Sequence, residues 1–437
     1  MKLSEELKWR GFVAEHTLGA VEDLDKGSRK FYLGVDPSAP SMTIGNLAAL
    51  MMCKVFMRHG YEATMLVGGA TGQIGDPKMD KERPLKPVEE IERNAKNISS
   101  QFERIMGKDI RIVNNNDWLS GLGFYQFLNE VGQYFSMTQL LDRDFVKART
   151  GEGGSGLSVA EFSYSLMQGY DFLHLFKTDG IDLQLCGVDQ IGNCMSGLHL
   201  IDKKEHAKAD IWSMPLIIDK VTGRKFGKSE GNAVWLAEGK TSVFDFYQFW
   251  LNQADESVED YLKFYTLIMP DELTALMAEH SEKPGERLAQ KRLAMGVTGI
   301  VHGGEKAEKV ARVTEILFGG STRLAHFEFF SAVRTHRILN TARLQSSKES
   351  SDCTQTRKTC PGDMDFELLA EFLATAEVGS LVSDALVSGG LAESKGEARR
   401  LIESGAVSVG GRKVVADETI GERAIVKKGK NKFMVVK

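Results

Sequence analysis

Apolar and polar positions follow two different rhythms along the first half of the chain. Short apolar runs of four to six residues predict strands at 31–35, 62–67, 110–113 and 181–185. Between these runs, apolar residues recur every three to four positions, which predicts helices at 44–58, 88–106, 159–176 and 190–201. Such alternation is typical of a parallel sheet with helices on both faces. Ligands of these sheets bind at the carboxyl ends of the strands, so we expect binding residues directly after Val35, Val67 and Leu185.

The pattern changes twice in the second half. Residues 243–318 carry only helical periodicity, whereas residues 340–365 are rich in Ser, Thr, Lys and Glu and hold too few apolar side chains to offset the cost of ordering them. A last compact unit begins near Val378. We therefore predict five parts: a parallel-sheet domain at 1–222, a loop and connector at 223–239, an all-helical domain at 240–330, a polar linker at 331–375 and a small α+β domain at 376–437.

Length and charge limit the class of protein. A chain of 437 residues is too long for one core, so two or three domains are expected. The charged N-terminus lacks the apolar core of a signal peptide, and the most apolar stretch, 47–57, is interrupted by Lys54 and is too short to span a bilayer. We therefore expect a soluble, cytoplasmic protein with no membrane partner. The net charge of −5 leaves nucleic acid open, because RNA binding needs only a local basic face.

The cysteines favour free thiols in a reducing compartment. They form an odd set: Cys53, Cys186, Cys194, Cys353 and Cys360. None belongs to a Cys-x-x-Cys pair, and no histidines lie nearby at zinc spacing. We therefore expect no tightly bound metal.

The loop after the first predicted strand is a candidate anion site. It runs from Gly34 through Asp36 and Thr43 to Asn46, at the start of the next helix. Free backbone N–H groups and the helix dipole both favour an anion there. Gly45, in the first turn, lets a flat ring approach the backbone. Taken alone, however, the loop is better explained as an ordinary strand-to-helix turn with Thr43 as a helix cap.

The loop after the second predicted strand contains Gly69-x-x-Gly72-x-x-Gly75. This spacing raises an NAD-dependent dehydrogenase as an alternative. The dinucleotide fingerprint belongs after the first strand of such a fold, whereas this one follows the second. Asp76-Pro77 then leads into a charged, proline-bounded loop where a dehydrogenase needs a long helix. Both features count against the alternative.

A third loop, 222–232, places Lys225 and Lys228 three residues apart among three glycines. Two lysines at this spacing can bring point charges onto phosphate oxygens. Alone, the motif is more commonly a lysine-rich surface loop. Together with the polar helix start after the first strand, it matches the two-part signature of class I aminoacyl-tRNA synthetases.

Further segments make the resemblance specific. They are Tyr32-Leu33-Gly34-Val35-Asp36-Pro37, Val67-Gly68-Gly69-Ala70-Thr71-Gly72, Phe162-Ser163-Tyr164, Gln168-Gly169-Tyr170-Asp171, Asp189-Gln190-Ile191-Gly192-Asn193 and Lys225-Phe226-Gly227-Lys228-Ser229. In order and spacing they resemble the bacterial-type tyrosyl-tRNA synthetases over nearly the whole chain apart from the linker. The resemblance implies a Rossmann-like catalytic domain, an anticodon-side helical domain, and ligation of tyrosine to tRNA(Tyr) with ATP and Mg²⁺ as co-substrate. It also implies a homodimer, with its contact helix at 124–131.

The resemblance assigns roles to individual residues. The phenol hydroxyl of tyrosine is held by Tyr32 and Asp171, since a buried hydroxyl needs a donor and an acceptor. The ammonium group is bound by Tyr164, Gln168 and Asp76, with support from Thr71 and Asn115, while Gln190 and Asp36 lie where the two substrates meet. The ATP-binding residues are Gly34, Asp36, Gly45, Asn46, Gly187, Asp189, Lys228 and Ser229. The catalytic residues, which act on the phosphates, are Lys225, Lys228, Thr43, Ser38, Lys81 and Arg83.

Two features depart from the family pattern. Thr43-Ile44-Gly45-Asn46 stands where the family usually has His-x-Gly-His. Thr can still donate to a phosphate, and Asn can donate as a neutral His does. The loop after Asp76-Pro77 is also one residue shorter, which bears on Lys81 and Arg83.

The C-terminal unit resembles an S4-type RNA-binding domain. Basic residues gather on a predicted helix, on a predicted hairpin at 407–414 and near the chain end: Lys395, Arg399, Arg400, Arg412, Lys413, Lys427, Lys428, Lys430 and Lys432. A solvated basic surface has the same composition, and a non-catalytic RNA-binding protein is therefore an alternative. A tryptophanyl enzyme is another, disfavoured because an indole does not need the pair of Tyr32 and Asp171.

Overall fold

The computed structural model describes residues 1–77, 85–141, 144–151, 154–218, 220, 223, 226, 228–229, 232–318, 363–429 and 431–437. These residues form two compact units, Met1–Ala307 and Glu308–Lys437. Among them, no helix combines the length and apolar character needed to cross a bilayer. Cys53, Cys186 and Cys194 are buried free thiols, as predicted; Cys353 and Cys360 lie outside the described residues.

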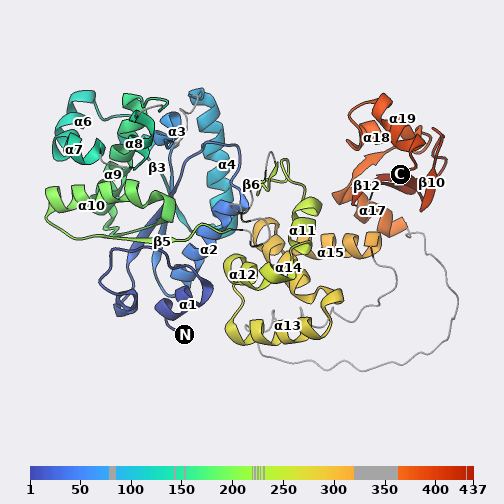
Figure 1. Cartoon of the computed structure of the whole chain (residues 1–437), viewed down its shortest axis with the longest axis horizontal. Helices are drawn as coiled ribbons and strands as arrows, with labels where there is room; N and C mark the ends of the chain where they lie inside the picture. The colour runs from blue at the N-terminus through green and yellow to red at the C-terminus, as the bar shows by residue number, and fades with distance from the viewer. Residues whose placement is uncertain are drawn as a thin grey trace. The chain divides into compact units, whose positions relative to one another are not determined.

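The first unit is built on a parallel five-stranded sheet (Figure 1). In spatial order its strands are β3 (Arg111–Asn114), β2 (Glu62–Val67), β1 (Lys30–Val35), β4 (Leu183–Gly187) and β5 (Asp210–Met214). The chain runs outward from β1 to β3 and then crosses back to β4, so the order reverses between β1 and β4. In open α/β sheets this reversal creates the ligand-binding crevice.

Right-handed crossovers decide which helices cover which face. Helices α2 (Ile44–Arg58) and α4 (Val88–Met106) join β1, β2 and β3 and cover one face of the sheet (Figure 1). Helices α9 (Val159–Asp179) and α10 (Ile191–Glu205) precede and follow β4 and cover the other (Figure 1). Because both faces are covered, the middle of each central strand is buried, which accounts for the apolar runs read from the sequence.

The predicted fold class is confirmed, with small shifts in the boundaries. All four predicted strands and four predicted helices of this unit are present; β4 begins two residues later than predicted, at Leu183. Strand β5 and the N-terminal helix α1 (Leu3–Arg10) were not predicted. Strand β5 follows a lysine-rich turn and has only a short apolar stretch, so its sequence does not predict a strand. It is part of the sheet because it pairs with β4.

Short helices fill the connection between β3 and α9. They are α5 (Asn116–Leu119), α6 (Phe124–Glu130), α7 (Met137–Leu141) and α8 (Asp144–Thr150). A further short helix, α3 (Thr71–Ile74), directly follows β2. Helix α6 corresponds to the contact helix that the sequence analysis expected at 124–131.

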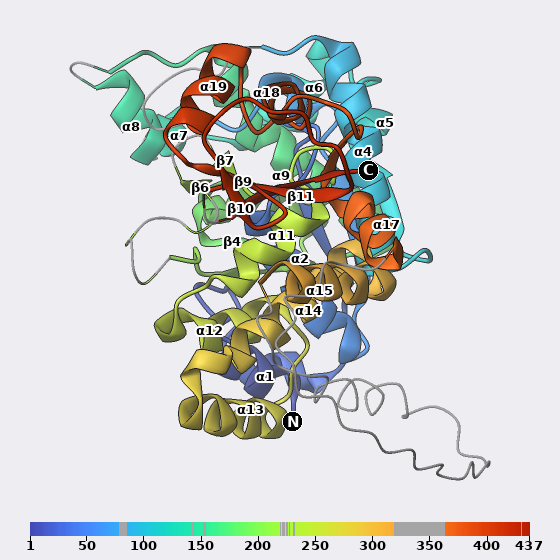
Figure 2. The same ribbon diagram turned by 90° about the vertical axis from the view of Figure 1, so that its right-hand side faces the viewer.

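The predicted helical part begins after a two-stranded hairpin of β6 (Lys228–Ser229) and β7 (Asn232–Ala233). Its helices are α11 (Val243–Leu251), α12 (Asp255–Tyr265), α13 (Pro270–Glu282), α14 (Leu288–His302) and α15 (Gly304–Phe318). Figure 2 shows α1 beside α12 and α13, so the N-terminus of the chain packs on the helical part.

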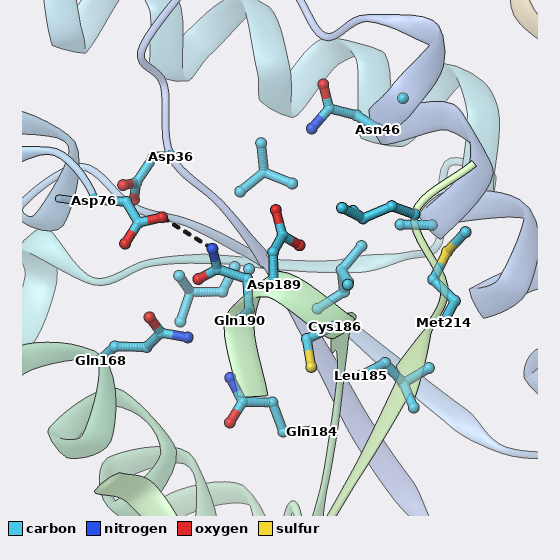
Figure 3. Close-up of a pocket in the computed structure, with 18 of the residues that line it drawn as sticks. Asp36, Asn46, Asp76, Gln168, Gln184, Leu185, Cys186, Asp189, Gln190 and Met214 are labelled. Carbon is cyan, nitrogen blue, oxygen red and sulfur yellow. Dashed lines mark hydrogen bonds between the residues drawn. The ribbon is translucent and has the colours of Figure 1, made fainter. Parts of the chain in front are cut away.

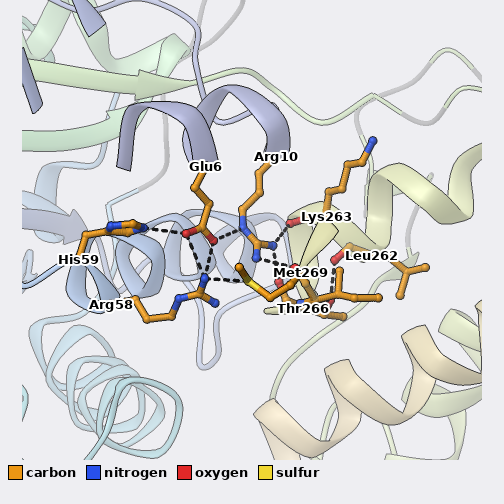
Figure 4. Close-up of polar contacts among 9 residues, drawn as sticks. Glu6, Arg10, Arg58, His59, Leu262, Lys263, Thr266 and Met269 are labelled. Atoms are coloured by element: carbon orange, nitrogen blue, oxygen red, sulfur yellow. Dashed lines mark hydrogen bonds and ion pairs between the residues drawn. The ribbon is translucent and has the colours of Figure 1, made fainter. Parts of the chain in front are cut away.

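Buried charges form this contact between α1 and α12 (Figure 4). The Arg10 guanidinium donates to three backbone carbonyls near the end of α12, those of Lys263, Thr266 and Ile268, at 2.8 Å each. It also donates to Glu6 at 2.7 Å. Both side chains are 1% exposed or less, so the carbonyls left free at the helix end are satisfied by a buried cation.

The second unit contains a five-stranded sheet in the order β10-β9-β11-β12-β8. Its strands are β8 (Ala374–Ala376), β9 (Val407–Val409), β10 (Arg412–Val414), β11 (Ala424–Lys428) and β12 (Lys432–Val436). Helices α18 (Val382–Ser388) and α19 (Lys395–Glu403) pack on it around a core that includes Leu386, Ile402 and Val426. Strands β9 and β10 are antiparallel, which confirms the predicted hairpin.

The linker predicted at 331–375 extends too far toward the C-terminus. Helix α17 (Asp363–Phe372) and part of β8 lie within that range. Phe366 and Leu369 of α17 are buried, and β8 pairs in parallel with β12. The apolar residues of this stretch are few and follow a long polar run, so the sequence alone does not mark it as structured. Strand β8 forms because β12, far along the chain, pairs with it.

Candidate active site

A cavity of about 360 Å³ opens at the carboxyl ends of β1 and β4, where the strand order reverses (Figure 3). It is lined by most of the residues that the sequence assigned to tyrosine and ATP: Tyr32, Gly34, Asp36, Ser38, Thr43, Gly45, Asn46, Thr71, Asp76, Tyr164, Gln168, Asp171, Gly187, Asp189 and Gln190. These residues come from segments up to 158 positions apart, from Tyr32 to Gln190, and the crossovers of the sheet bring them together.

Other predicted residues lie elsewhere. Asn115 is fully buried behind the cavity wall. Lys81, Arg83, Lys225 and Lys430 lie outside the described residues, as do the side chains of Lys228 and Ser229, whose backbone forms β6. The cavity is also lined by residues that the sequence analysis missed: Gln184, Cys186, Met214, Leu216, Ile217, Phe226 and Tyr265. The strand alternation of β4 could have pointed to Gln184 and Cys186, because they flank Leu185 at the end already singled out.

A phenol and a carboxylate occupy the apolar end of the cavity. The Tyr32 hydroxyl is buried and has no hydrogen-bond partner among the described residues. Both oxygens of Asp171 accept hydrogen bonds, from Trp118 Nε1 at 2.8 Å and from Asn115 Nδ2 at 2.9 Å. Burial raises the pKa of Asp171 to about 7, although these two hydrogen bonds favour the charged form. Trp118 was missed because nothing in its local sequence marks it.

Two further carboxylates are held by hydrogen bonds beside this end. Asp36 accepts from the hydroxyls of Thr71 at 2.7 Å and Tyr164 at 2.8 Å. Asp76 accepts from the amides of Gln190 at 2.9 Å and Asn193 at 3.0 Å (Figure 3 draws the Gln190 contact). Fixed carboxylates of this kind attract a cation such as an amino-acid ammonium group. Burial raises the pKa of the Tyr164 hydroxyl well above its usual value, and the negative charge of Asp36 is the second cause. The hydroxyl therefore stays protonated and can donate a hydrogen bond.

The predicted phosphate donors are arranged differently from the sequence expectation. The Thr43 hydroxyl donates to Asn46 Oδ1 at 3.1 Å, and the same oxygen accepts from the Thr43 backbone at 3.0 Å. This arrangement caps the start of α2. It directs Asn46 Nδ2, which has no partner among the described residues, toward the cavity (Figure 3). Asn46, rather than Thr43, therefore offers the free donor.

The glycines after β2 serve the protein's own packing. A Cβ atom on Gly68 would lie 2.0 Å from Asp36 Oδ1, and one on Gly72 would lie 2.8 Å from Pro37 Cδ. A Cβ on Gly69 would lie 2.3 Å from Asn114 Oδ1. Residues of the loop after β1 and of the end of β3 therefore occupy the space beside these glycines. The glycine spacing thus has a packing explanation and no longer supports the dehydrogenase alternative.

Comparison with known proteins agrees with this geometry. The profile described as "tRNA synthetases class I (W and Y)" matches residues 25–319, and the profile described as "Tyrosine--tRNA ligase SYY-like C-terminal domain" matches residues 370–436. A tyrosine–tRNA ligase of Leuconostoc citreum is 39% identical over 100% of both chains, and one of Cytophaga hutchinsonii is 36% identical over 99% of this chain and 98% of its own. The chain belongs to the tyrosine–tRNA ligase family.

Solved structures show the same relationship for the synthetase. The C-terminally truncated mitochondrial tyrosyl-tRNA synthetase of Coccidioides posadasii is 30% identical, with a TM-score of 0.63 over 71% of this chain and 91% of that chain. A tryptophanyl-tRNA synthetase from Encephalitozoon cuniculi is 14% identical, with a TM-score of 0.52 over 70% and 89% of the two chains, and shares the fold. The ligase function predicted from the sequence is confirmed, and the alternative of a non-catalytic RNA-binding protein is wrong.

Asp171→Asn is expected to change how the stability of the synthetase depends on pH. The pKa of about 7 in the folded protein exceeds the ordinary value of 3.8. The contribution of Asp171 to folding is thus fully present below pH 3.8 and is lost as the pH rises to about 7. The amide does not titrate, so between about pH 5 and pH 8 the variant should gain ~3 kcal/mol in free energy of unfolding relative to the wild type.

Urea unfolding at the two pH values measures this change. Asp117→Asn, which removes an exposed aspartate from the neighbouring helix α5, is the matched control. A difference between variant and wild type that stays constant across the range would show that Asp171 is not protonated in the folded protein near neutral pH.

Proposed function

We propose that the synthetase activates tyrosine with ATP and transfers it to the 3′ end of tRNA(Tyr). The choice of tyrosine rests on the Tyr32 hydroxyl, which is buried in the same cavity as the Asp171 carboxylate and has no partner in the described part of the chain. A bound phenol can accept from Tyr32 and donate to Asp171, so both groups are satisfied. An indole N–H only donates, and a phenyl ring does neither. Each of these leaves a buried polar group unpaired, which costs about 1–3 kcal/mol.

The first step needs positioning and charge stabilisation rather than a covalent enzyme intermediate. A carboxylate oxygen of tyrosine attacks the α-phosphorus of ATP, the bond to the bridging oxygen breaks, and pyrophosphate leaves with the electron pair. Asp36 and Asp76 lie on one side of the cavity and Asn46 on the other (Figure 3), so the ammonium group and the phosphates have separate places. Mg²⁺, carried by ATP, neutralises part of the phosphate charge. Lys225 and Lys228 bind the departing pyrophosphate in this proposal, and Asn46 and Ser38, which line the cavity, add neutral donors.

The nucleoside lies along the loops at the ends of β1 and β4. Gly34, Gly45 and Gly187 line the cavity there, and a Cβ on Gly187 would lie 2.6 Å from Asp189 Oδ1. The absence of a side chain at Gly187 keeps the Asp189 carboxylate in place for the ribose hydroxyls. Gln190 is bound to Asp76 and so links the ribose side of the site to the ammonium side.

In the second step, a ribose hydroxyl at the 3′ end of the RNA attacks the carbonyl of the adenylate, and AMP leaves. The C-terminal unit holds the RNA through exposed basic side chains: Lys395, Arg399, Arg400, Arg412 and Lys413. Lys428 contributes less, because it is half-buried and bound to Glu397 and to the carbonyl of Leu391. Lys427 lies over the Phe433 ring, 5.2 Å from its centroid. We place this activity in the cytoplasm.

The synthetase is further proposed to act as a homodimer with one RNA bridging two subunits. Helix α6 presents large apolar side chains to solvent: Phe124 is 72% exposed, Tyr125 82% and Leu128 43%. Apolar residues gathered on one short helix are typical of a protein interface. This face is therefore the proposed contact between subunits.

Tyrosine should be the preferred amino acid in pyrophosphate exchange measured with all twenty. Tyr32→Phe is expected to lower kcat/KM for tyrosine about 10-fold, because one hydrogen bond to the phenol is lost, and to leave that for phenylalanine unchanged. Exchange with tryptophan or phenylalanine equal to that with tyrosine would rule out the proposed substrate.

Substitutions in the two units should separate activation from RNA binding. Lys228→Ala is expected to slow adenylate formation by roughly 10²–10³-fold, because a donor to the leaving phosphates is lost.

Arg400→Glu with Lys413→Glu should leave pyrophosphate exchange intact, raise KM for the RNA and reduce the slope of log affinity against log salt concentration. Lys240→Glu, an exposed lysine of the first unit, is the control. If the double variant charges RNA like the wild type, these residues do not hold the RNA.

Tyr125→Lys should convert a dimer into a monomer, because it introduces a charge into the proposed apolar contact. Light scattering at micromolar concentration measures the mass, and RNA charging should fall with it. Val88→Lys, which adds the same charge at an exposed apolar position of α4, is expected to change neither. A monomeric wild type that charges RNA fully would contradict the dimer.

A further inference from the structure

The ring of Phe226 is inserted among four aromatic side chains of the helical part. It is 5% exposed and stacks on Tyr261 of α12, with ring centroids 4.3 Å apart at an angle of 27°. The rings of Phe249, Trp250 and Tyr265 surround it at 5.5–5.9 Å. We call these four residues of α11 and α12 the aromatic seat. A buried aromatic ring at such distances contributes both its area and favourable ring–ring contacts.

The aromatic seat borders the active-site cavity. Phe226 and Tyr265 both line the cavity. The backbone N–H of Phe226 also donates to the carbonyl of Ile217 at 2.8 Å, and Ile217 is a further lining residue. Phe226 is therefore fixed at its backbone by the catalytic sheet side and at its ring by the helical part.

The chain is fixed a second time shortly after Phe226. Beyond the β6–β7 hairpin, the Ile44 N–H donates to the Val234 carbonyl at 3.1 Å, and the Leu236 N–H donates to the Met42 carbonyl at 2.9 Å. These bonds join the connector to the loop that carries Thr43. In the sequence, Lys228 lies two residues after Phe226 and six residues before Val234. The chain is therefore held on both sides of Lys228.

Helix α12, which supplies half of the seat, is itself held at its end. The three carbonyls that accept from Arg10 lie within or just beyond the last turn, next to Tyr265. These hydrogen bonds attach the end of α12 to α1. Phe226 therefore packs against a helix that is held to the catalytic part by a buried guanidinium.

We propose that Phe226 is a positioning residue for ATP activation: the aromatic seat holds its ring, and this anchor sets the reach of Lys228 toward the phosphates. The inference rests on the proposed function, because it concerns the lysine that binds pyrophosphate there. Phe226 itself needs no contact with the amino acid. Loss of the anchor should therefore affect the steps that involve phosphate and leave tyrosine binding as it was.

Phe226→Ala is expected to reduce kcat/KM for ATP in pyrophosphate exchange by roughly 10- to 100-fold, the cost typical of a small misplacement of a catalytic group. KM for tyrosine should change by less than about twofold. Transfer of tyrosine from preformed adenylate to tRNA should also stay within about twofold, since AMP and not pyrophosphate leaves in that step. Phe226→Leu, which keeps apolar volume in the seat, should recover part of the lost rate.

Phe264→Ala is the matched control. It removes a ring from α12, the helix that carries Tyr261 and Tyr265, but this ring contacts Phe12. It should lower thermal stability without a selective effect on ATP. Equal effects of the two alanine variants, or a loss in tyrosine binding as large as that for ATP, would overturn the proposal. If Phe226→Ala does not fold, Phe226→Leu decides by the same criterion. A wild type without tyrosine-dependent exchange would instead contradict the proposed function.

Discussion

A continuous chain of buried hydrogen bonds at the carboxyl ends of the strands determines the shape of the active site. The Thr71 hydroxyl donates to Asp36, Asn115 Nδ2 lies 2.9 Å from both Thr71 Oγ1 and Asp171 Oδ2, and Trp118 completes the shell of Asp171. The Asn115 oxygen is itself occupied by the backbone N–H of Ala70. This series of hydrogen bonds joins the ends of β1, β2 and β3 to helix α9.

The network explains why so many small and polar residues occur where the sheet is most buried. A carboxylate such as Asp36 or Asp171 is costly to bury unless donors surround it. The glycines after β2 allow Asp36 to approach, and the position of Asn115 allows one amide to bind two segments. Because each member holds its neighbour, the cavity can present several carboxylates in fixed positions before any substrate arrives.

Much of this arrangement could be predicted from the sequence, because its residues fall in short motifs that resemble those of the tyrosyl-tRNA synthetases. Tyr32, Asp36, Thr71 and Asp171 were all assigned to the site through that resemblance, and all four line the cavity. What could not be predicted depends on partners far along the chain. Arg10 gives no local signal of its three carbonyl partners more than 250 residues away, and the cap of Asn46 by Thr43 depends on side-chain geometry. Strand β8 likewise becomes a strand only beside β12.

The cap at the start of α2 also changes how phosphate charge must be countered. Where the family pattern has two histidines, this chain has the Thr43 hydroxyl, which donates to Asn46, and the Asn46 amide nitrogen, which has no partner within the described ranges. Neither group carries a charge at any ordinary pH. An amide donor to an anion is weaker than a cationic one, so in the proposed mechanism a larger share of the charge stabilisation falls on Lys225 and Lys228. Their position then matters more, which gives the tight insertion of Phe226 between the catalytic sheet and the helical part its importance.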